Sequence, residues 1–264
     1  MANTVIHTPQ CRPVAASSKD KILFSMNLLI YKAEFFLRAS VGVGINGISP
    51  GLVQGPVPIG ATLANITNSA RRVIEELGLA TVGHLRAIKQ VLRSNLPFPG
   101  PQLDLSAQVF AGFVNLGFNV STLSPPFNIY ANTLSFGLAA EAICIYSTIL
   151  RRNYTFDRRR RATTVPPYTF TMAELTNRTS EVVNRLGGCG VKDEGLIVPF
   201  QLGAENRSTS NVVPGDVNSL AHARFEREIL RIVFGTGNAT MPGGLFPDGF
   251  IGALYQLIIN LKLS

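Results

Sequence analysis

Residues 61–95 read ATLANITNSARRVIEELGLATVGHLRAIKQVLRSN, and this stretch decides the fold. It contains no proline, and its interior glycines are Gly78 and Gly83. Its small and apolar residues recur at intervals of three and four, the spacing of a buried helical stripe: Ile66, Ala70, Val73, Ile74, Leu77, Ala80, Thr81, His84, Ala87, Ile88 and Val91. The spacing predicts one long amphipathic helix, against which the rest of the chain packs.

The bulk composition describes a folded chain with a local basic segment. At 264 residues and 46% hydrophobic content the chain can bury a sizeable core, which argues against global disorder. Only 15% of the residues are charged and the net charge is +8. The basic residues are concentrated in one short segment, at Arg151, Arg152, Arg158, Arg159, Arg160 and Arg161. This segment is either a solvated loop or a contact for an acidic partner, such as a phosphate, a membrane surface or a wall polysaccharide.

Three cysteines allow at most one disulfide within the chain. Cys144 lies in the apolar run AAEAICIYSTIL and is expected in the core. Cys11 and Cys189 lie in polar surroundings, PQCRP and GGCGV, and are the natural pair if a bridge exists. None of the three is in a CxxC or in ligand spacing with a histidine, so a zinc site is not expected.

Further helical segments predict an all-α fold. Residues 17–42 begin with a serine N-cap and carry Asp20 in the first turn, where the helix dipole favours an acid. A third long helix is expected at residues 128–152, and Thr171 and Glu174 are spaced as a capping box for a helix over residues 171–186. A shorter helix is expected at residues 225–234.

The domain organisation that follows has three parts. Residues 1–16 are expected to be a flexible tail, and residues 17–189 a helical domain in which three long helices associate. Residues 190–264 are rich in turns and are expected to form an extension that wraps this domain and adds no second core. No run of apolar residues reaches the length of a membrane span.

The glycine-rich motif at residues 42–47, GVGING, matches the GxGxxG spacing of a dinucleotide-binding loop. That fingerprint requires a strand before the loop and a helix directly after it, whereas here a helix comes first. A glycine that ends the first helix in the left-handed conformation explains the motif instead.

Three polar residues fall at or near the predicted buried faces of three helices: Glu34, His84 and Glu141. Buried polar groups need partners. These three are either remnants of a metal site or a core histidine hydrogen-bonded to one of the carboxylates. No GxSxG, HExxH or phosphate-binding loop occurs, so no catalytic residues are expected.

Many separate phrases, in order along most of the chain, resemble the plant desiccation-related proteins, which carry a ferritin-like domain. They are AEFFLRASVGVG, GPVPIGATLAN, IEELGLATVGHLRAI, PPFNIYANTLSF, ELTNRTSEVVNRLG, GVKDEGLIVP, GAENRSTSN, DVNSL and EILRIVFGTGNATMPGG. The resemblance implies a ferritin-like helical bundle, here degenerate with three to four long helices and an irregular C-terminal extension. It also implies a secreted or cell-wall relative and an association with water stress.

The chain departs from that family where metal would bind. The family typically reads EVGH in the second helix, whereas this chain has TVGH, so Thr81 stands where the glutamate of an ExxH motif would be. The first helix has Leu29 and Lys32 in a region that is acidic in the family. The basic linker of residues 151–167 replaces the fourth bundle helix.

The functional expectation is therefore a non-enzymatic, stress-associated protein with a structural or binding role. A ferritin-like pair of ions takes a glutamate from each of two helices and an ExxH from each of the other two. This chain offers too few ligands, so iron or manganese is not expected. The alternatives are a di-metal ferritin-like oxidoreductase and a basic protein that binds polyanions or cell wall through its arginine-rich segment.

The location and completeness of the chain lead to two further expectations. Six N-x-S/T sequons and the resemblance favour a secreted protein, although no apolar leader opens this chain, which would place it in the cytoplasm if it is complete as given. The sequons lie at Asn65, Asn119, Asn153, Asn177, Asn206 and Asn238. The missing leader, the lost helix and a divergent end together suggest a shortened or alternatively spliced product, whose gap the helix at residues 171–186 partly covers.

Overall fold

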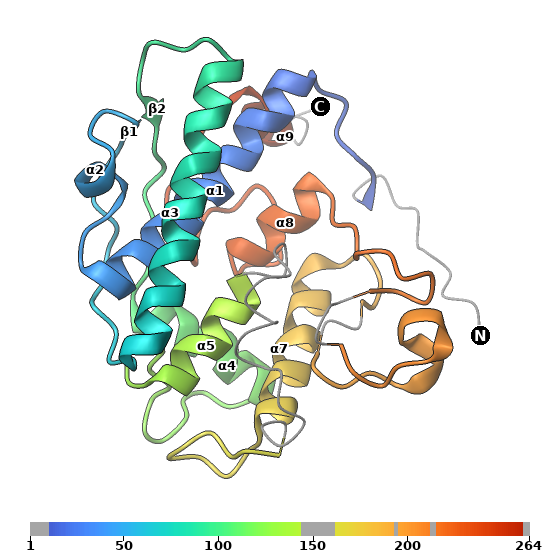
Figure 1. Cartoon of the computed structure of the whole chain (residues 1–264). Helices are drawn as coiled ribbons and strands as arrows, with labels where there is room; N and C mark the ends of the chain where they lie inside the picture. The colour runs from blue at the N-terminus through green and yellow to red at the C-terminus, as the bar shows by residue number, and fades with distance from the viewer. Residues whose placement is uncertain (1–10, 144–161, 193–194, 212–214, 261–264) are drawn as a thin grey trace.

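The computed structural model describes residues 11–143, 162–192, 195–211 and 215–260, and over these residues the protein is a helical assembly (Figure 1). The helices are α1 (Ser18–Val41), α2 (Ile45–Ile48), α3 (Asn68–Val91), α4 (Ala107–Phe118), α5 (Thr133–Ile143), α7 (Met172–Gly187), α8 (Glu226–Val233) and α9 (Ala253–Asn260). Two short 3-10 helices, η4 (Phe200–Leu202) and η5 (Ala204–Asn206), precede α8. Strands β1 (Val53–Gln54) and β2 (Phe98–Pro99) form a two-residue parallel pair. The expected all-α fold is confirmed.

Local capping sets the ends of α1 as the sequence predicts. The Ser17 hydroxyl accepts a hydrogen bond from the Asp20 backbone N–H at 3.1 Å, which satisfies one of the free donors of the first turn. At the other end Gly42 adopts the left-handed conformation and its N–H donates to the Arg38 carbonyl. The helix therefore stops at Val41, and the chain turns away over the GVGING loop.

Helices α1 and α3 form a tightly packed antiparallel pair (Figure 1). Leu37, near the end of α1, lies against Gly78, where an added Cβ would come within 2.8 Å of the leucine side chain. At the other end of the pair, Ser25 and Val91 line one shallow surface pocket. The absence of a side chain at Gly78 thus lets the two helices approach closely.

The buried face of α3 differs from the predicted stripe. Ala70, Ile74, Leu77 and Thr81 are buried as predicted, but the stripe does not continue through His84 and Val91, which are exposed. The other buried residues of the helix include Gly78, Val82 and Leu85. Since α1 approaches α3 at Gly78, the buried face is centred on that glycine, and Ala80, His84 and Ala87 are exposed.

The remaining helices pack beside this pair. Phe35 of α1 stacks on Phe136 of α5 with ring centroids 4.9 Å apart, which joins α5 to the first helix. Helix α7 lies beside α4, α5 and α8. The helix predicted at residues 171–186 is α7. The apolar run at residues 109–118, for which no helix was expected, belongs to α4.

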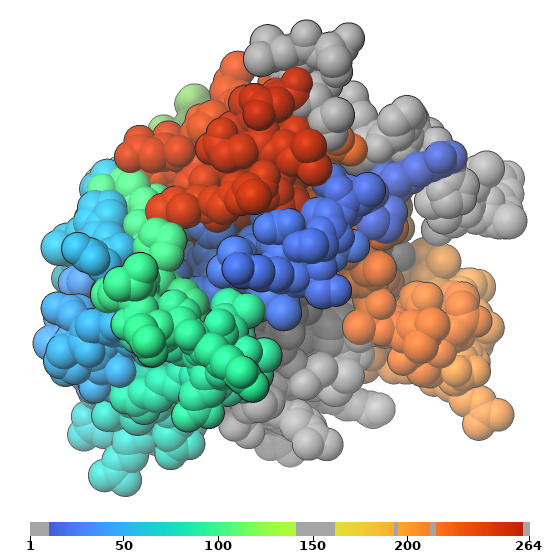
Figure 2. Space-filling view, turned by 90° about the horizontal axis from the view of Figure 1, so that it is seen from above, coloured from blue at the N-terminus to red at the C-terminus, as the bar shows by residue number. Residues whose placement is uncertain are grey.

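Both ends of the described chain join the same core. Cys11 and Cys189 form a disulfide with a Cα–Cα distance of 5.5 Å, and the Val14 N–H donates to Glu226 at 3.0 Å. The expected flexible tail is therefore packed from Cys11 onward. The last helix, α9, packs on α1, and Figure 2 shows the C-terminal segment lying against the N-terminal helix.

Two expectations fall on parts of the chain that the structure does not describe. The first residues of the linker expected at 151–167, together with Arg151, Arg152, Arg158, Arg159, Arg160 and Arg161, lie outside the described residues, as does Cys144. Within the parts that are described, no helix is long and apolar enough to cross a membrane.

Candidate functional site

The buried carboxylate of Glu34 holds the loop that follows α1. Its side chain accepts a hydrogen bond from Arg38 Nε at 2.6 Å and another from the Ile45 backbone N–H at 2.9 Å. A Cβ at Gly44 would overlap this carboxylate, so the glycine is required by the close approach. The GVGING motif is thus a structural turn locked to an acid, and Glu34 faces this loop.

Thr81 and His84, the two residues in the ExxH positions, are not arranged to bind a metal. Thr81 is 1% exposed, and its hydroxyl donates to the Leu77 carbonyl of its own helix at 2.7 Å. His84, one turn later, is exposed. Among the described residues, no core histidine hydrogen-bonded to Glu34 is found, because the carboxylate accepts from Arg38 and Ile45 and the His84 side chain is exposed.

The third candidate cannot be placed against these two. Glu141 belongs to α5, but its side chain is outside the described residues. Among the side chains that are described, no group of three or more His, Cys, Asp or Glu residues could hold a metal ion. A threonine on the ExxH face and the separation of Glu34 from His84 do not fit the donor set of a ferritin-like pair of ions.

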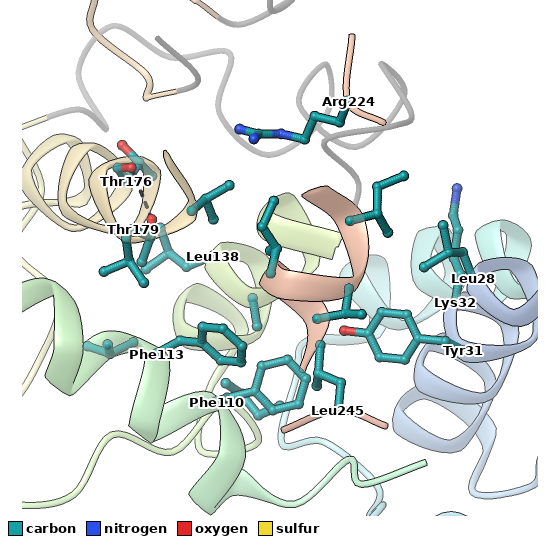
Figure 3. A pocket seen from close by; sticks show the side chains of 18 of the residues that line it. Leu28, Tyr31, Lys32, Phe110, Phe113, Leu138, Thr176, Thr179, Arg224 and Leu245 are labelled. Carbon is teal, nitrogen blue, oxygen red and sulfur yellow. Dashed lines mark hydrogen bonds between the residues drawn. The ribbon is translucent and has the colours of Figure 1, made fainter. Parts of the chain in front are cut away.

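A cavity of about 490 Å³ lies between the helices (Figure 3). Side chains from α1, α3, α4, α5, α7 and α8 line it, and most are aliphatic or aromatic. Phe110 and Phe113 of α4 close one side, and Tyr31 points its hydroxyl group inward (Figure 3). The volume is in the range of about 300–1,000 Å³ that is typical of small-molecule sites, so the cavity is large enough for an organic ligand.

Within the described part of the chain, the basic residues that line this cavity are Lys32, His84 and Arg224, and no acidic residue lines it. Lys32 and His84 lie on α1 and α3. The antiparallel pairing, with Leu37 beside Gly78 and Ser25 near Val91, places these two residues at the same level of the helix pair. Figure 3 shows the charged ends of Lys32 and Arg224 on the side of the view away from Phe110 and Phe113.

A buried ion cluster lies beside the cavity and was not predicted from the sequence. Glu228 of α8 is fully buried and binds Arg224 at 2.5 Å and Lys192 at 2.6 Å. Arg231 donates to the Gly187 carbonyl at 2.7 Å. Burial lowers the pKa of Arg231, the Glu228 charge raises it, and the Arg227 charge lowers it. The i,i+4 spacing of Arg224 and Glu228 in ARFEREIL is the sequence pattern that could have indicated this ion pair.

Comparisons with known proteins place the chain in a family. It is 36% identical to the ferritin-like catalase Nec2 of Nesocodon mauritianus over 293 positions, which cover 96% of this chain and 92% of that protein. It is 34% identical to the desiccation-related protein PCC13-62 of Craterostigma plantagineum over 280 positions, which cover 94% of this chain and 88% of that protein. No family model and no solved structure matches the chain.

The helical fold and these relatives define a ferritin-like class of protein. The chain belongs to the desiccation-related, ferritin-like protein family. Its alignment with the catalase spans more positions than the 264 residues of this chain, so that relative carries residues with no counterpart here.

Proposed function

We propose that this chain is a non-enzymatic member of the family that acts by binding a ligand inside its helical assembly. The observation that carries the proposal is Thr81. It occupies the glutamate position of the ExxH motif and is almost fully buried, and its hydroxyl group donates a hydrogen bond to the carbonyl of Leu77. A neutral hydroxyl supplies neither the negative charge nor the two oxygens of a metal-ligating carboxylate.

The name of one relative supports the alternative hypothesis, a di-metal ferritin-like oxidoreductase. That protein is called a ferritin-like catalase, and redox turnover of this kind depends on a redox-active group that the protein binds. In this chain Glu34 is committed to Arg38 and Ile45, and Lys32 brings a cation to the cavity. A cation beside His84 opposes the binding of a second cation, so the chain has kept the fold and lost the conditions for a di-metal centre.

Metal analysis of the purified protein tests this proposal. Iron and manganese are measured by mass spectrometry after incubation with each ion and removal of the excess, and peroxide decomposition is followed on the same samples. We expect metal far below one ion per chain, no peroxide decomposition above buffer, and no change in the His84→Ala variant. A stoichiometric metal that is lost in His84→Ala would establish the di-metal oxidoreductase instead.

We also propose that the protein acts outside the cytosol. The Cys11–Cys189 disulfide supports an oxidising compartment, and three sequon asparagines, Asn65, Asn119 and Asn206, are exposed. Asn65 lies before α3, whereas the sequence predicted that it would lie inside the helix. Protein isolated from its source tissue should lose apparent mass on treatment with an N-glycosidase. An unchanged mass together with free thiols at Cys11 and Cys189 would contradict this location.

The arginine-rich segment supplies a third candidate function, binding to polyanions or cell wall. Its residues are outside the described part of the chain, so the support for it is the charge of the sequence alone. Binding to anionic vesicles should weaken steeply with salt and disappear when Arg158, Arg159, Arg160 and Arg161 are replaced by glutamine. Binding that survives this replacement would remove the candidate.

A further inference from the structure

We infer that the cavity binds an amphiphile with one aliphatic chain and a carboxylate headgroup, and that Lys32 and His84 hold the headgroup. The inference rests on the proposed binding function and names the chemistry of the ligand. Three features carry it: the apolar interior, two basic side chains at one level of the α1–α3 pair, and the lack of any acidic side chain among the described residues that line the cavity.

The interior of the cavity suits an aliphatic chain. Its walls are built from Leu28 and Leu29 of α1, Phe110 and Phe113 of α4, and the leucine and valine side chains of α5, α7 and α8. Transfer of an aliphatic chain from water to such surroundings is favourable, and the gain grows with each buried methylene group. An apolar chain therefore gains free energy in this cavity, whereas a polar ligand would lose its hydration there without equivalent hydrogen bonds.

The basic side chains suit an anionic headgroup. Neither Lys32 nor His84 has a hydrogen-bond or ion-pair partner among the described residues, although both line the cavity. Arg224, the third basic residue, is already bound to the buried Glu228, so its guanidinium is engaged outside the Lys32–His84 pair. A carboxylate placed near Lys32 and His84 would supply a counter-charge and accept hydrogen bonds from both, and a cationic headgroup would be repelled.

Calorimetric titration with matched amphiphiles tests the inference. Dodecanoate and dodecyltrimethylammonium, each below its critical micelle concentration, and dodecanol, below its solubility limit, are titrated into the full-length protein. We expect dodecanoate to bind with one site per chain, dodecanol to bind at least tenfold more weakly, and the cation not to bind. Equal affinity for dodecanoate and the cation, or no binding of dodecanoate, would overturn the inference.

Substitutions locate the site and its orientation. Lys32→Met should weaken dodecanoate binding by about tenfold or more, because a charge-assisted hydrogen bond is lost, and His84→Ala should weaken it as well, because a hydrogen-bond donor is lost. The matched control is Lys19→Met, which removes an exposed lysine of the same helix away from the cavity and should leave the affinity unchanged. Equal losses in Lys32→Met and Lys19→Met would show that only general charge attracts the ligand, and would overturn the assignment.

Filling the cavity completes the test. Val183 of α7 is partly buried and lines the cavity, so Val183→Trp should occupy the space of the aliphatic chain and abolish dodecanoate binding. A circular dichroism melt shows whether the variant is folded. If it is not folded, the binding test uses Val183→Leu instead. Full affinity in a folded Val183→Trp protein would place the ligand elsewhere. The metal content of the same samples reports separately on the proposed function, so the two failures are distinguishable.

Discussion

At the scale of single residues, the sequence predicts that Glu34 lies at a buried edge and needs a partner, but it cannot supply the partner. The structure gives one from the same helix, Arg38, and one from the backbone of Ile45, which only the turn at Gly42 and Gly44 brings into range. Burial follows from the apolar spacing of α1 alone, whereas the hydrogen bond to Ile45 depends on how the next loop closes. That is why a local sequence pattern could not separate a structural acid from a metal ligand.

Removing the charge of Glu34 should destabilise the protein without changing its metal content. Glu34→Gln leaves the Arg38 guanidinium facing an amide in a largely buried setting, so we expect the free energy of unfolding to fall by about 1–3 kcal/mol in urea titrations. The control is Glu174→Gln, which breaks an exposed pair with Arg178 at 3.7 Å and should cost below about 0.5 kcal/mol. Equal losses in the two variants would contradict the locking role of Glu34.

At the scale of helices, the sequence predicts where a helix ends better than it predicts which face of the helix is buried. Thr171 caps α7 by accepting from the Glu174 N–H at 3.2 Å, and Gly188 ends the helix, because caps depend on a few adjacent residues. The face of α3 was misplaced because apolar residues occur on more than one side of it. Leu79 is 39% exposed and Val91 is 76% exposed. Contact with α1, which no periodicity within α3 records, decides which side is buried.

The close approach of α1 and α3 leads to a paired prediction on two glycines of one helix. Alanine at either position gains helix propensity worth about 1 kcal/mol. At Gly78 the new Cβ would also lie 2.8 Å from Leu37, and overpacking of this kind costs about 1–3 kcal/mol. At Gly83 nothing lies within 4 Å. We therefore expect Gly83→Ala to raise the thermal midpoint and Gly78→Ala to leave it unchanged or lower it. A Gly78→Ala protein as stable as Gly83→Ala would show that the two helices are not held in close contact.

At the scale of the whole molecule, contacts between distant residues join segments that the sequence analysis assigned to separate parts of the chain. Asn27 of α1 donates to the Ile251 carbonyl and accepts from the Ile251 N–H, both at 2.9 Å, across 224 residues of chain. The Cys11–Cys189 bridge spans 178 residues. The composition of residues 190–264, with many turns and few long apolar runs, predicts no second core there. It does not reveal that Phe246, Phe250 and Tyr255 complete the first one.

This shared core predicts that a substitution near the C-terminus will destabilise the entire protein. Phe250 is buried, and its ring lies 4.9 Å from Phe24 of α1 and 4.4 Å from Phe246. Phe250→Ala leaves a cavity between the two ends of the chain, and we expect a loss of about 3–5 kcal/mol in the free energy of unfolding. The near-ultraviolet and far-ultraviolet circular dichroism signals should still change in one coincident transition.

The matched control is Leu257→Ala on α9, whose side chain is 39% exposed, and it should cost below about 1 kcal/mol. If residues 190–264 were a dispensable wrapping, Phe250→Ala would instead produce a small early transition and leave the main one at its original midpoint. A separate early transition would mean that α1 keeps its packing without the C-terminal segment. A single shifted transition would mean that the binding cavity, which Ile229 and Leu245 help to line, depends on that segment as much as on α1.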